Sequence, residues 1–134
     1  MILLMAAAAL AAGNTDSVVG KWRAESKNAV VDIERCGASI CGKLTGSDGL
    51  RAKPDMLDTN NKDAALRGRK VLGLPMIGGP FTFKDGAWTG GTVYNPEDGG
   101  TYKATLSLTD NDHLKLKGCI VWPLCKTQTW TRIR

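Results

Sequence analysis

Apolar and polar residues alternate along the last third of the chain, residues 101–134. The apolar residues of the first run stand at every second position: Tyr102, Ala104, Leu106 and Leu108. This period of two is typical of a strand with one buried face. Residues 110–112 supply turn chemistry, after which Leu114 and Leu116 resume the alternation. The pattern predicts an antiparallel meander whose last strand is the Thr-rich run 126–134.

Shorter runs of the same kind precede this meander. They are apolar, they are bounded by turn residues, and they cover residues 18–24, 29–35, 40–45, 70–77, 81–84 and 87–94. Pro75 indicates an edge or a bend within its run. Eight or nine short strands at regular spacing predict an all-β fold. We expect an antiparallel up-and-down barrel of eight strands, with at most one extra short strand and little helix.

The segment 46–69 lacks this alternation and carries five Lys or Arg and four Asp residues. Asn60 or Asn61 is a candidate N-cap for a short helix that ends at Leu66. We expect a long surface connection with one or two helical turns. Loops of this length often carry function or move, and a solvated charged loop is the competing interpretation.

The chain of 134 residues is long enough for one domain with a single core, and we expect residues 12–134 to form it. The 18 Lys and Arg exceed the 13 Asp and Glu, which gives a net charge of +5. That charge favours acidic partners or a membrane surface, although ordinary solubility is the simpler explanation.

An uncharged apolar run, MILLMAAAALA, occupies residues 1–11. It is too short to span a bilayer. It fits the apolar core of a secretory signal peptide, and Ala9-Leu10-Ala11 fits a cleavage site, although the usual positive segment before the core is missing. We therefore expect a periplasmic or secreted protein; a buried N-terminal helix is the alternative.

The four cysteines form two close pairs, Cys36 with Cys41 and Cys119 with Cys125. Four Cys allow three disulfide connectivities, and four thiolates can also hold zinc. The spacings are wider than those of typical zinc knuckles, and an export signal favours oxidation. Neighbouring strands of a hairpin can hold Cβ atoms about 4 Å apart, as a disulfide requires. We therefore expect two local disulfides.

No stretch of the sequence indicates a reaction. A catalytic site needs an acid–base pair or a nucleophile beside a base, and the single His, His113, is expected on the solvent face of its strand. Asp55, Asp58 and Asp63 share the long connection but lack the ligand spacing of a calcium loop. Four polar residues are expected to build one turn: Tyr94, Asn95, Asp98 and Tyr102. We expect no enzyme activity, no cofactor or metal, and no nucleic-acid partner.

Trp22 and Arg132 bear on how the barrel closes. Gly20-Lys21-Trp22 lies in the first run and Arg132 in the last. The first and last strands of an up-and-down barrel must pair, so we expect the Arg132 guanidinium to stack on the Trp22 ring. This arrangement resembles that of the calycins. Trp130 is expected in the core, and Trp122 at the barrel rim, where it meets a ligand, a partner or lipid, or simply covers the barrel end.

A longer set of motifs resembles the bacterial family called domain of unknown function 2147. The matching segments are Gly20-Lys21-Trp22, Cys36-Gly37, Cys41-Gly42-Lys43, Asp58-x-Asn60, Gly73-Leu74, Trp88-x-Gly90-Gly91, Tyr94-Asn95-Pro96, Asp98-Gly99-x-Thr101-Tyr102, Leu114-x-Leu116-x-Gly118 and Thr127-Gln128-Thr129-Trp130-Thr131-Arg132. Residues 46–57 match poorly, and Asn95 stands where the family often has Asp. The resemblance implies an exported small barrel of the lipocalin or calycin kind. It implies no established activity.

Three kinds of function remain open. The first is binding of a small apolar ligand inside the barrel, because eight strands leave room for packed side chains or one small ligand. The inward candidates for lining such a ligand are Val31, Ile33, Leu44, Leu74, Tyr102, Leu106, Leu116 and Trp130. The second is a structural or protein-interaction module with a filled barrel, in peripheral contact with the envelope. An enzyme ranks last, and the sequence leaves the oligomeric state open.

Overall fold

The computed structural model describes residues 14–121 and 124–134, so the expected signal peptide and Trp122 lie outside the described residues. Its strands are β1 (Gly20–Arg23), β2 (Val30–Cys36), β3 (Ser39–Gly46), β4 (Pro75–Gly78), β5 (Thr82–Lys84), β6 (Ala87–Asn95), β7 (Gly100–Asp110), β8 (His113–Val121) and β9 (Leu124–Ile133). The helix α2 (Asp48–Ala52) and two 3-10 turns, Ser26–Asn28 and Ala64–Leu66, lie in the connections. Within this described part, no helix is both long enough and apolar enough to cross a membrane.

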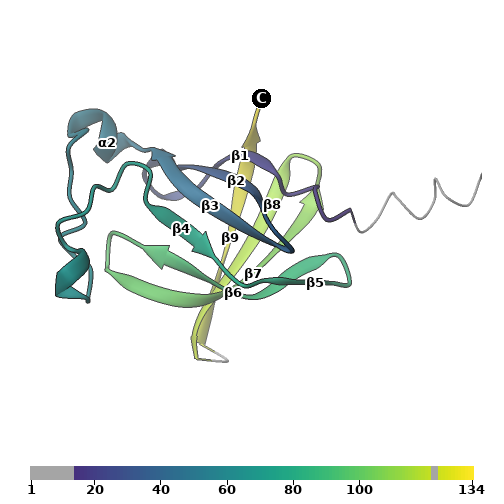
Figure 1. Ribbon diagram of the computed structural model, residues 1–134. Coiled ribbons are helices and arrows are strands. Elements are labelled where there is room, and N and C mark those ends of the chain that lie inside the picture. Colours follow the sequence, from purple (N-terminus) through teal and green to yellow (C-terminus); the bar gives the residue numbers. More distant parts are fainter. Residues whose placement is uncertain (1–13, 122–123) are drawn as a thin grey trace, which may run out of the picture.

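Eight of the nine strands close into an antiparallel barrel (Figure 1). Around the barrel the order is β4, β3, β2, β1, β9, β8, β7 and β6, and β4 pairs in turn with β6. The short β5 pairs with β6 beside this circuit. The predicted eight-stranded up-and-down barrel with one extra short strand is therefore confirmed.

Much of the barrel interior is a packed core. Its most deeply buried side chains alternate along β1, β2, β7, β8 and β9 and expose at most 1% of their surface: Trp22, Val31, Ile33, Leu106, Leu114 and Trp130. Side chains this inaccessible border no space that a water molecule could enter, either outside the barrel or within it. This part of the interior is thus filled by the protein itself, in the manner of small barrels.

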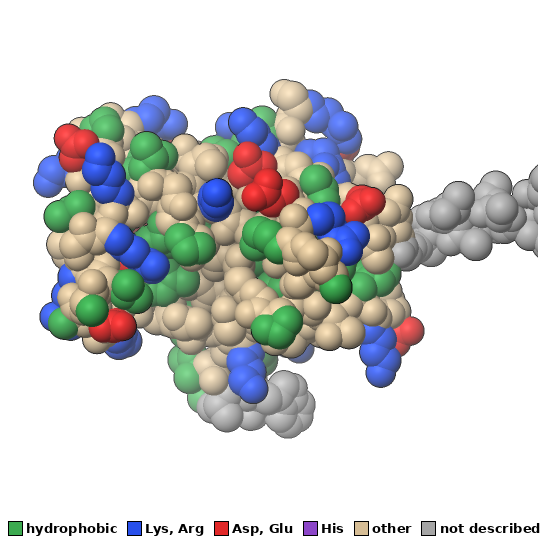
Figure 2. Space-filling view, in the orientation of Figure 1, with side chains coloured by type: hydrophobic (Ala, Val, Ile, Leu, Met, Phe, Trp, Pro, Cys, Tyr) green, Lys and Arg blue, Asp and Glu red, His purple; other side chains and the backbone are tan. Residues whose placement is uncertain are grey.

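The long connection between β3 and β4, residues 47–74, covers one end of the barrel (Figure 1, left). Within the segment 46–69, Leu50 in α2 is buried with the core and the half-buried Met56 packs against it. Figure 2 shows basic and acidic side chains together on the outside of this connection. The interpretation of the segment as a purely solvated charged loop is therefore wrong, because its apolar side chains complete the core.

The expected short helix near residue 66 is a single 3-10 turn, Ala64–Leu66. Its cap is Asp63, whose carboxylate accepts a hydrogen bond from the Ala65 N–H at 3.0 Å. The sequence-based choice of Asn60 or Asn61 is wrong, because both amides have other partners in the fold, described below.

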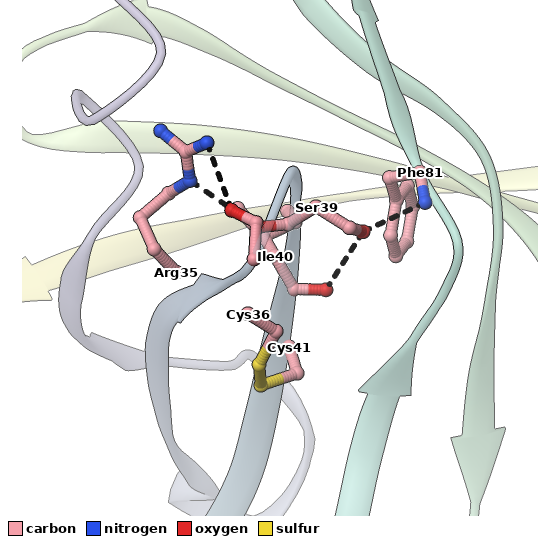
Figure 3. Close-up of a disulfide and its surroundings, with 7 residues drawn as sticks. Arg35, Cys36, Ser39, Ile40, Cys41 and Phe81 are labelled. Atoms are coloured by element: carbon pink, nitrogen blue, oxygen red, sulfur yellow. Dashed lines mark hydrogen bonds between the residues drawn. A yellow bond between two sulfur atoms is a disulfide. The ribbon is translucent and has the colours of Figure 1, made fainter.

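The two expected local disulfides are present, and they join Cys36 to Cys41 and Cys119 to Cys125. The first lies in the β2–β3 hairpin (Figure 3), where the Ser39 hydroxyl also accepts a hydrogen bond from the Phe81 N–H at 2.7 Å. The second pairs β8 directly with β9, so β9 begins at Leu124 and not at the predicted residue 126.

Candidate functional site

Arg132 closes one end of the barrel against Trp22. The guanidinium carbon lies 4.3 Å from the centroid of the indole, and the two residues face each other in the β1–β9 ladder. The guanidinium also donates hydrogen bonds to the carbonyl oxygens of Ser17 (2.7 Å), Val19 (3.0 Å) and Asn111 (2.7 Å). The N-terminal segment and the β7–β8 turn are thereby tied to the last strand, so this end of the barrel is built for closure rather than recognition.

The residues expected to line a ligand divide into two groups. Seven are buried in the packed interior or beneath the long connection: Val31, Ile33, Leu44, Leu74, Leu106, Leu116 and Trp130. The eighth, Tyr102, is half-buried at the opposite end of the barrel, where it borders an open pocket. Of the eight, Tyr102 is thus the residue that a ligand from solution can reach without entering the core.

The pocket has a volume of about 700 Å³ and lies where the long connection meets the ends of β6, β7 and β8. Its apolar wall includes Leu66, Met76, Tyr102 and Ile120, and its charged positions are Lys62, Asp63 and Arg69. This volume falls within the range of small-molecule sites, which combine an apolar lining with a few polar groups.

Asp58 is the polar centre behind one wall of this pocket. Its carboxylate has no exposed surface and accepts hydrogen bonds from the Tyr94 hydroxyl (2.6 Å), Asn61 Nδ2 (2.9 Å) and Arg69 Nε (2.9 Å). Burial alone would raise the pKa of Asp58, but these hydrogen bonds and the Arg69 charge outweigh it and hold the pKa below its ordinary value. Burial, reinforced by the bond to Asp58, raises the pKa of Tyr94 to about 12. The fold therefore fixes an ionised Asp58 against a neutral Tyr94.

This cluster corrects two sequence-based assignments. Tyr94 does not build the turn that follows it; it lies within β6 and uses its hydroxyl on a residue of the long connection. Asp58 is not a solvated loop charge. The turn itself is built as expected, because Asn95 Oδ1 accepts from the Glu97 N–H (3.0 Å) and Asp98 Oδ1 from the Gly100 N–H (2.7 Å).

A second contact fastens the long connection to the β6–β7 turn. Asn60 Nδ2 donates to the carbonyl oxygens of Pro96 (3.3 Å) and Glu97 (3.0 Å). Gly99 adopts φ +73°, and a side chain there would collide with the Asn60 carbonyl. The close backbone approach therefore requires glycine at this position. The two segments form one rigid rim beside the pocket.

Arg69 presents a positive charge to the pocket from a fixed position. Its Nε is bound to Asp58, its guanidinium carbon lies 5.3 Å from the centroid of the Tyr94 ring, and its side chain is 30% exposed. A cation held between a carboxylate and an aromatic face has little freedom left to lose when a ligand binds.

His113 lies at the end of the barrel opposite the pocket, where β8 begins after the β7–β8 turn. Its Nδ1 is 2.8 Å from the Asp110 carboxylate, and its side chain is 44% exposed. The pKa of Asp110 is lowered, first by a hydrogen bond from the backbone N–H of Asp112 and then by the hydrogen bond with the His113 side chain. This is a turn contact at the surface, as expected for a solvent-facing residue. Across residues 14–121 and 124–134, no three His, Cys, Asp or Glu side chains are grouped closely enough to hold a metal ion.

Comparison with known proteins places this barrel among bacterial relatives. No curated protein matches the chain. A solved structure described as "Protein HP1028 from the human pathogen Helicobacter pylori belongs to the lipocalin family" is similar, with a TM-score of 0.76 and 20% identity over 87% of this chain and 83% of that chain. At this identity the likeness concerns the fold alone. A family model described as "Uncharacterized protein conserved in bacteria (DUF2147)" matches residues 20–132, so the chain belongs to that bacterial family.

Proposed function

We propose that this protein is a binding module that takes up a small, largely apolar molecule in the pocket beside the long connection. The observation that carries the proposal is the combination of an apolar wall, formed in part by Leu66, Met76 and Tyr102, with a rim that is already fixed. A preformed site loses less conformational entropy on binding than a mobile one. The lipocalin-like fold supports a ligand-binding role of this kind.

The charged positions on the pocket wall favour a ligand with acceptor oxygens at one end. Arg69 is oriented by Asp58, and Lys62 lies on the same wall, where its Nζ reaches the Asp98 carbonyl at 3.4 Å. Asp63 stands beside them and offsets part of their charge. The proposed ligand therefore has an apolar body and one polar, hydrogen-bond-accepting end.

We propose binding without catalysis, and a location outside the cytoplasm. The second point is supported by two disulfides, which persist mainly in oxidising compartments. The expected export signal at residues 1–11 supports the same location.

A structural or protein-interaction role is the second candidate, because the packed interior around Trp22 and Trp130 leaves no central cavity among those side chains. Native mass spectrometry of protein purified from its own envelope separates the two. A retained small molecule supports binding, and a retained protein subunit supports the interaction role.

The pocket is tested with the fluorescent apolar probe N-phenyl-1-naphthylamine. Leu66→Glu places a charge in the pocket wall, whereas Leu72→Glu is a matched control, since Leu72 is also an exposed leucine of the long connection and does not line the pocket. We expect saturable probe binding by the parent, at least about tenfold weaker binding by Leu66→Glu, and little change in Leu72→Glu. Equal binding by all three would reject the pocket as the site.

A further inference from the structure

We propose that the β8–β9 hairpin docks the protein on an anionic lipid bilayer, with Ile120 and Leu124 entering the head-group region. The lysines behind these two residues then face lipid phosphates. This surface adjoins the proposed ligand pocket, whose wall includes Ile120, but docking does not depend on the pocket being occupied.

The end of the hairpin presents the most exposed large apolar side chains among the described residues. Ile120 is 70% exposed and Leu124 is 63% exposed, whereas Leu57, Leu66 and Leu72 are 38–49% exposed. Single exposed apolar residues are ordinary on protein surfaces. Here two of them lie together at the end of a hairpin that projects from the barrel (Figure 1). Such a projection can reach a flat surface before the rest of the molecule touches it.

The hairpin is held rigid just behind these side chains. Cys119 faces Cys125 in the ladder, and the two are joined by a disulfide. Regular pairing then continues from Gly118 with Lys126 back to His113 with Thr131. The two strands are therefore ordered up to the apolar pair before binding, so docking does not require the strands of the hairpin to become ordered.

The charge of the hairpin fits an anionic surface. In residues 113–121 and 124–133 there are no Asp or Glu residues, and the cations are Lys115, Lys117, Lys126 and Arg132. Lys103 on β7 adds a further exposed charge beside Cys119. Figure 2 shows apolar and basic side chains side by side near the projecting end. Basic groups near an anionic leaflet strengthen attachment, and the attraction falls with added salt.

The spacing of these groups matches the depth of a shallow insertion. A strand rises about 3.3 Å per residue. Lys117 therefore lies about 10 Å behind Ile120, and Lys126 lies about 7 Å behind Leu124. Apolar groups of peripheral proteins enter the head-group boundary by roughly 5–10 Å. Insertion of the apolar pair thus brings the exposed lysines level with the phosphates.

A lipid surface fits this feature better than a protein partner does. Two apolar side chains offer far less than the roughly 1,000 Å² that a specific protein interface buries. A bilayer requires no shape complementarity, and the flanking lysines supply the attraction that two apolar side chains alone cannot. The partner that the hairpin fits is therefore an anionic lipid surface.

The test is flotation of the purified full-length protein with vesicles. Phosphatidylethanolamine vesicles containing phosphatidylglycerol are compared with vesicles of phosphatidylcholine alone. We expect binding to the anionic vesicles, weaker binding in high salt, and at least about tenfold weaker binding by the double variant Ile120→Ser/Leu124→Ser. Lys103→Gln/Lys117→Gln/Lys126→Gln should weaken binding by about a hundredfold, because each lysine adds to the attraction independently.

The matched control is Leu57→Ser/Leu72→Ser, which removes two exposed leucines from the long connection. This variant should bind anionic vesicles as the parent does. Equal binding by the hairpin variants and the parent would overturn the proposal, as would equal binding to both kinds of vesicle. Unchanged vesicle binding together with loss of a dimer in Ile120→Ser/Leu124→Ser would instead assign the hairpin to a contact between copies.

Discussion

The Tyr94 hydroxyl donates a hydrogen bond of 2.6 Å to the buried carboxylate of Asp58, 36 residues earlier in the chain. This bond joins β6 to the long connection and fixes one wall of the pocket. Because Asp58 has no exposed surface, no water can replace the hydroxyl without a rearrangement of the connection. The two residues therefore link the stability of the barrel to the shape of the proposed site.

Tyr94→Phe removes this hydroxyl and leaves a buried carboxylate short of one donor. We expect the free energy of unfolding, measured in urea, to fall by roughly 1–3 kcal/mol. Tyr102→Phe is the matched control, since its hydroxyl donates at 2.5 Å to Asp98 in an exposed turn. That variant should lose less, about 1 kcal/mol or below. An equal loss in the two variants would show that burial of Asp58 does not set the cost.

Acid should destabilise the protein partly through Asp58. The pKa of Asp58 is lowered in the folded chain, so its contribution is present above the ordinary Asp pKa of about 4 and is lost as the pH falls through the folded value. Asp58→Asn should therefore unfold with a shallower dependence on pH below about 5. Asp55→Asn, at a side chain that is 95% exposed, should keep the parent's dependence. Urea unfolding at a series of pH values measures both.

High pH should test the Asp58–Tyr94 pair through the ionisation of Tyr94. The pKa of Tyr94 is raised to about 12, and the hydrogen bond to Asp98 raises that of Tyr102 as well. Because the folded pKa of Tyr94 lies above its unfolded value, its contribution is complete below about pH 10 and disappears as the pH rises toward 12. These are the chain's two tyrosines. In a phenolate absorbance titration of Tyr102→Phe, whose single tyrosine is Tyr94, we expect no ionisation near pH 10 until the protein unfolds; ionisation near pH 10 in the folded variant would contradict the assignment.

Arg132→Lys should weaken the closed end of the barrel. Lys keeps the charge but cannot stack its head on Trp22 while bonding three carbonyl oxygens, so we expect a loss of roughly 1–3 kcal/mol. Arg134→Lys is the control, because Arg134 is 67% exposed and contacts the exposed Asp112. Trp22→Ala should cost more, about 3–5 kcal/mol. An Arg132→Lys protein as stable as the parent in urea would reject the structural role of the stack.

Gly99→Ala should separate the long connection from the β6–β7 turn. Gly99 and Gly86 both have positive φ, +73° and +81°, so alanine is strained at either position. At Gly86 nothing lies within 4 Å of the added carbon, whereas at Gly99 it meets the Asn60 backbone. We expect Gly86→Ala to cost about 1–2 kcal/mol and Gly99→Ala distinctly more, with loss of naphthylamine binding only in the latter. Similar unfolding free energies for Gly99→Ala and Gly86→Ala would mean that the rim shifts to accommodate the added methyl group.

The barrel could be predicted from the sequence because its signal is local. Alternation in β7 and β8 identifies the buried face, and turn residues separate the strands. The same alternation cannot show whether inward residues line a cavity or fill it. Val31 and Trp130 follow the inward pattern, and the structure places both in the packed core. That distinction depends on the combined volume of side chains from all the strands, which the sequence of one strand does not reveal.

The Asp58 cluster could not be predicted in the same way. Its members come from a loop without periodicity and from a strand 36 residues away, and burial of a carboxylate depends on partners that only the closed fold assembles. The available signal was the family pattern, which includes Asp58-x-Asn60 and Tyr94-Asn95-Pro96 among its segments. The motif marked the positions without indicating that they meet.

The barrel closes at β4 and β6 through two residue pairs, Ile77 with Val93 and Gly78 with Thr92, whereas the β6–β7 ladder has seven. Together with the β3–β4 ladder, which also has two pairs, this seam is the narrowest part of the hydrogen-bonded circuit, so its amides should exchange with solvent before those of the opposite wall. Gly78 and Thr92 also border the pocket. The barrel can thus open locally at the place where a ligand would enter, while the end closed by Arg132 keeps its shape.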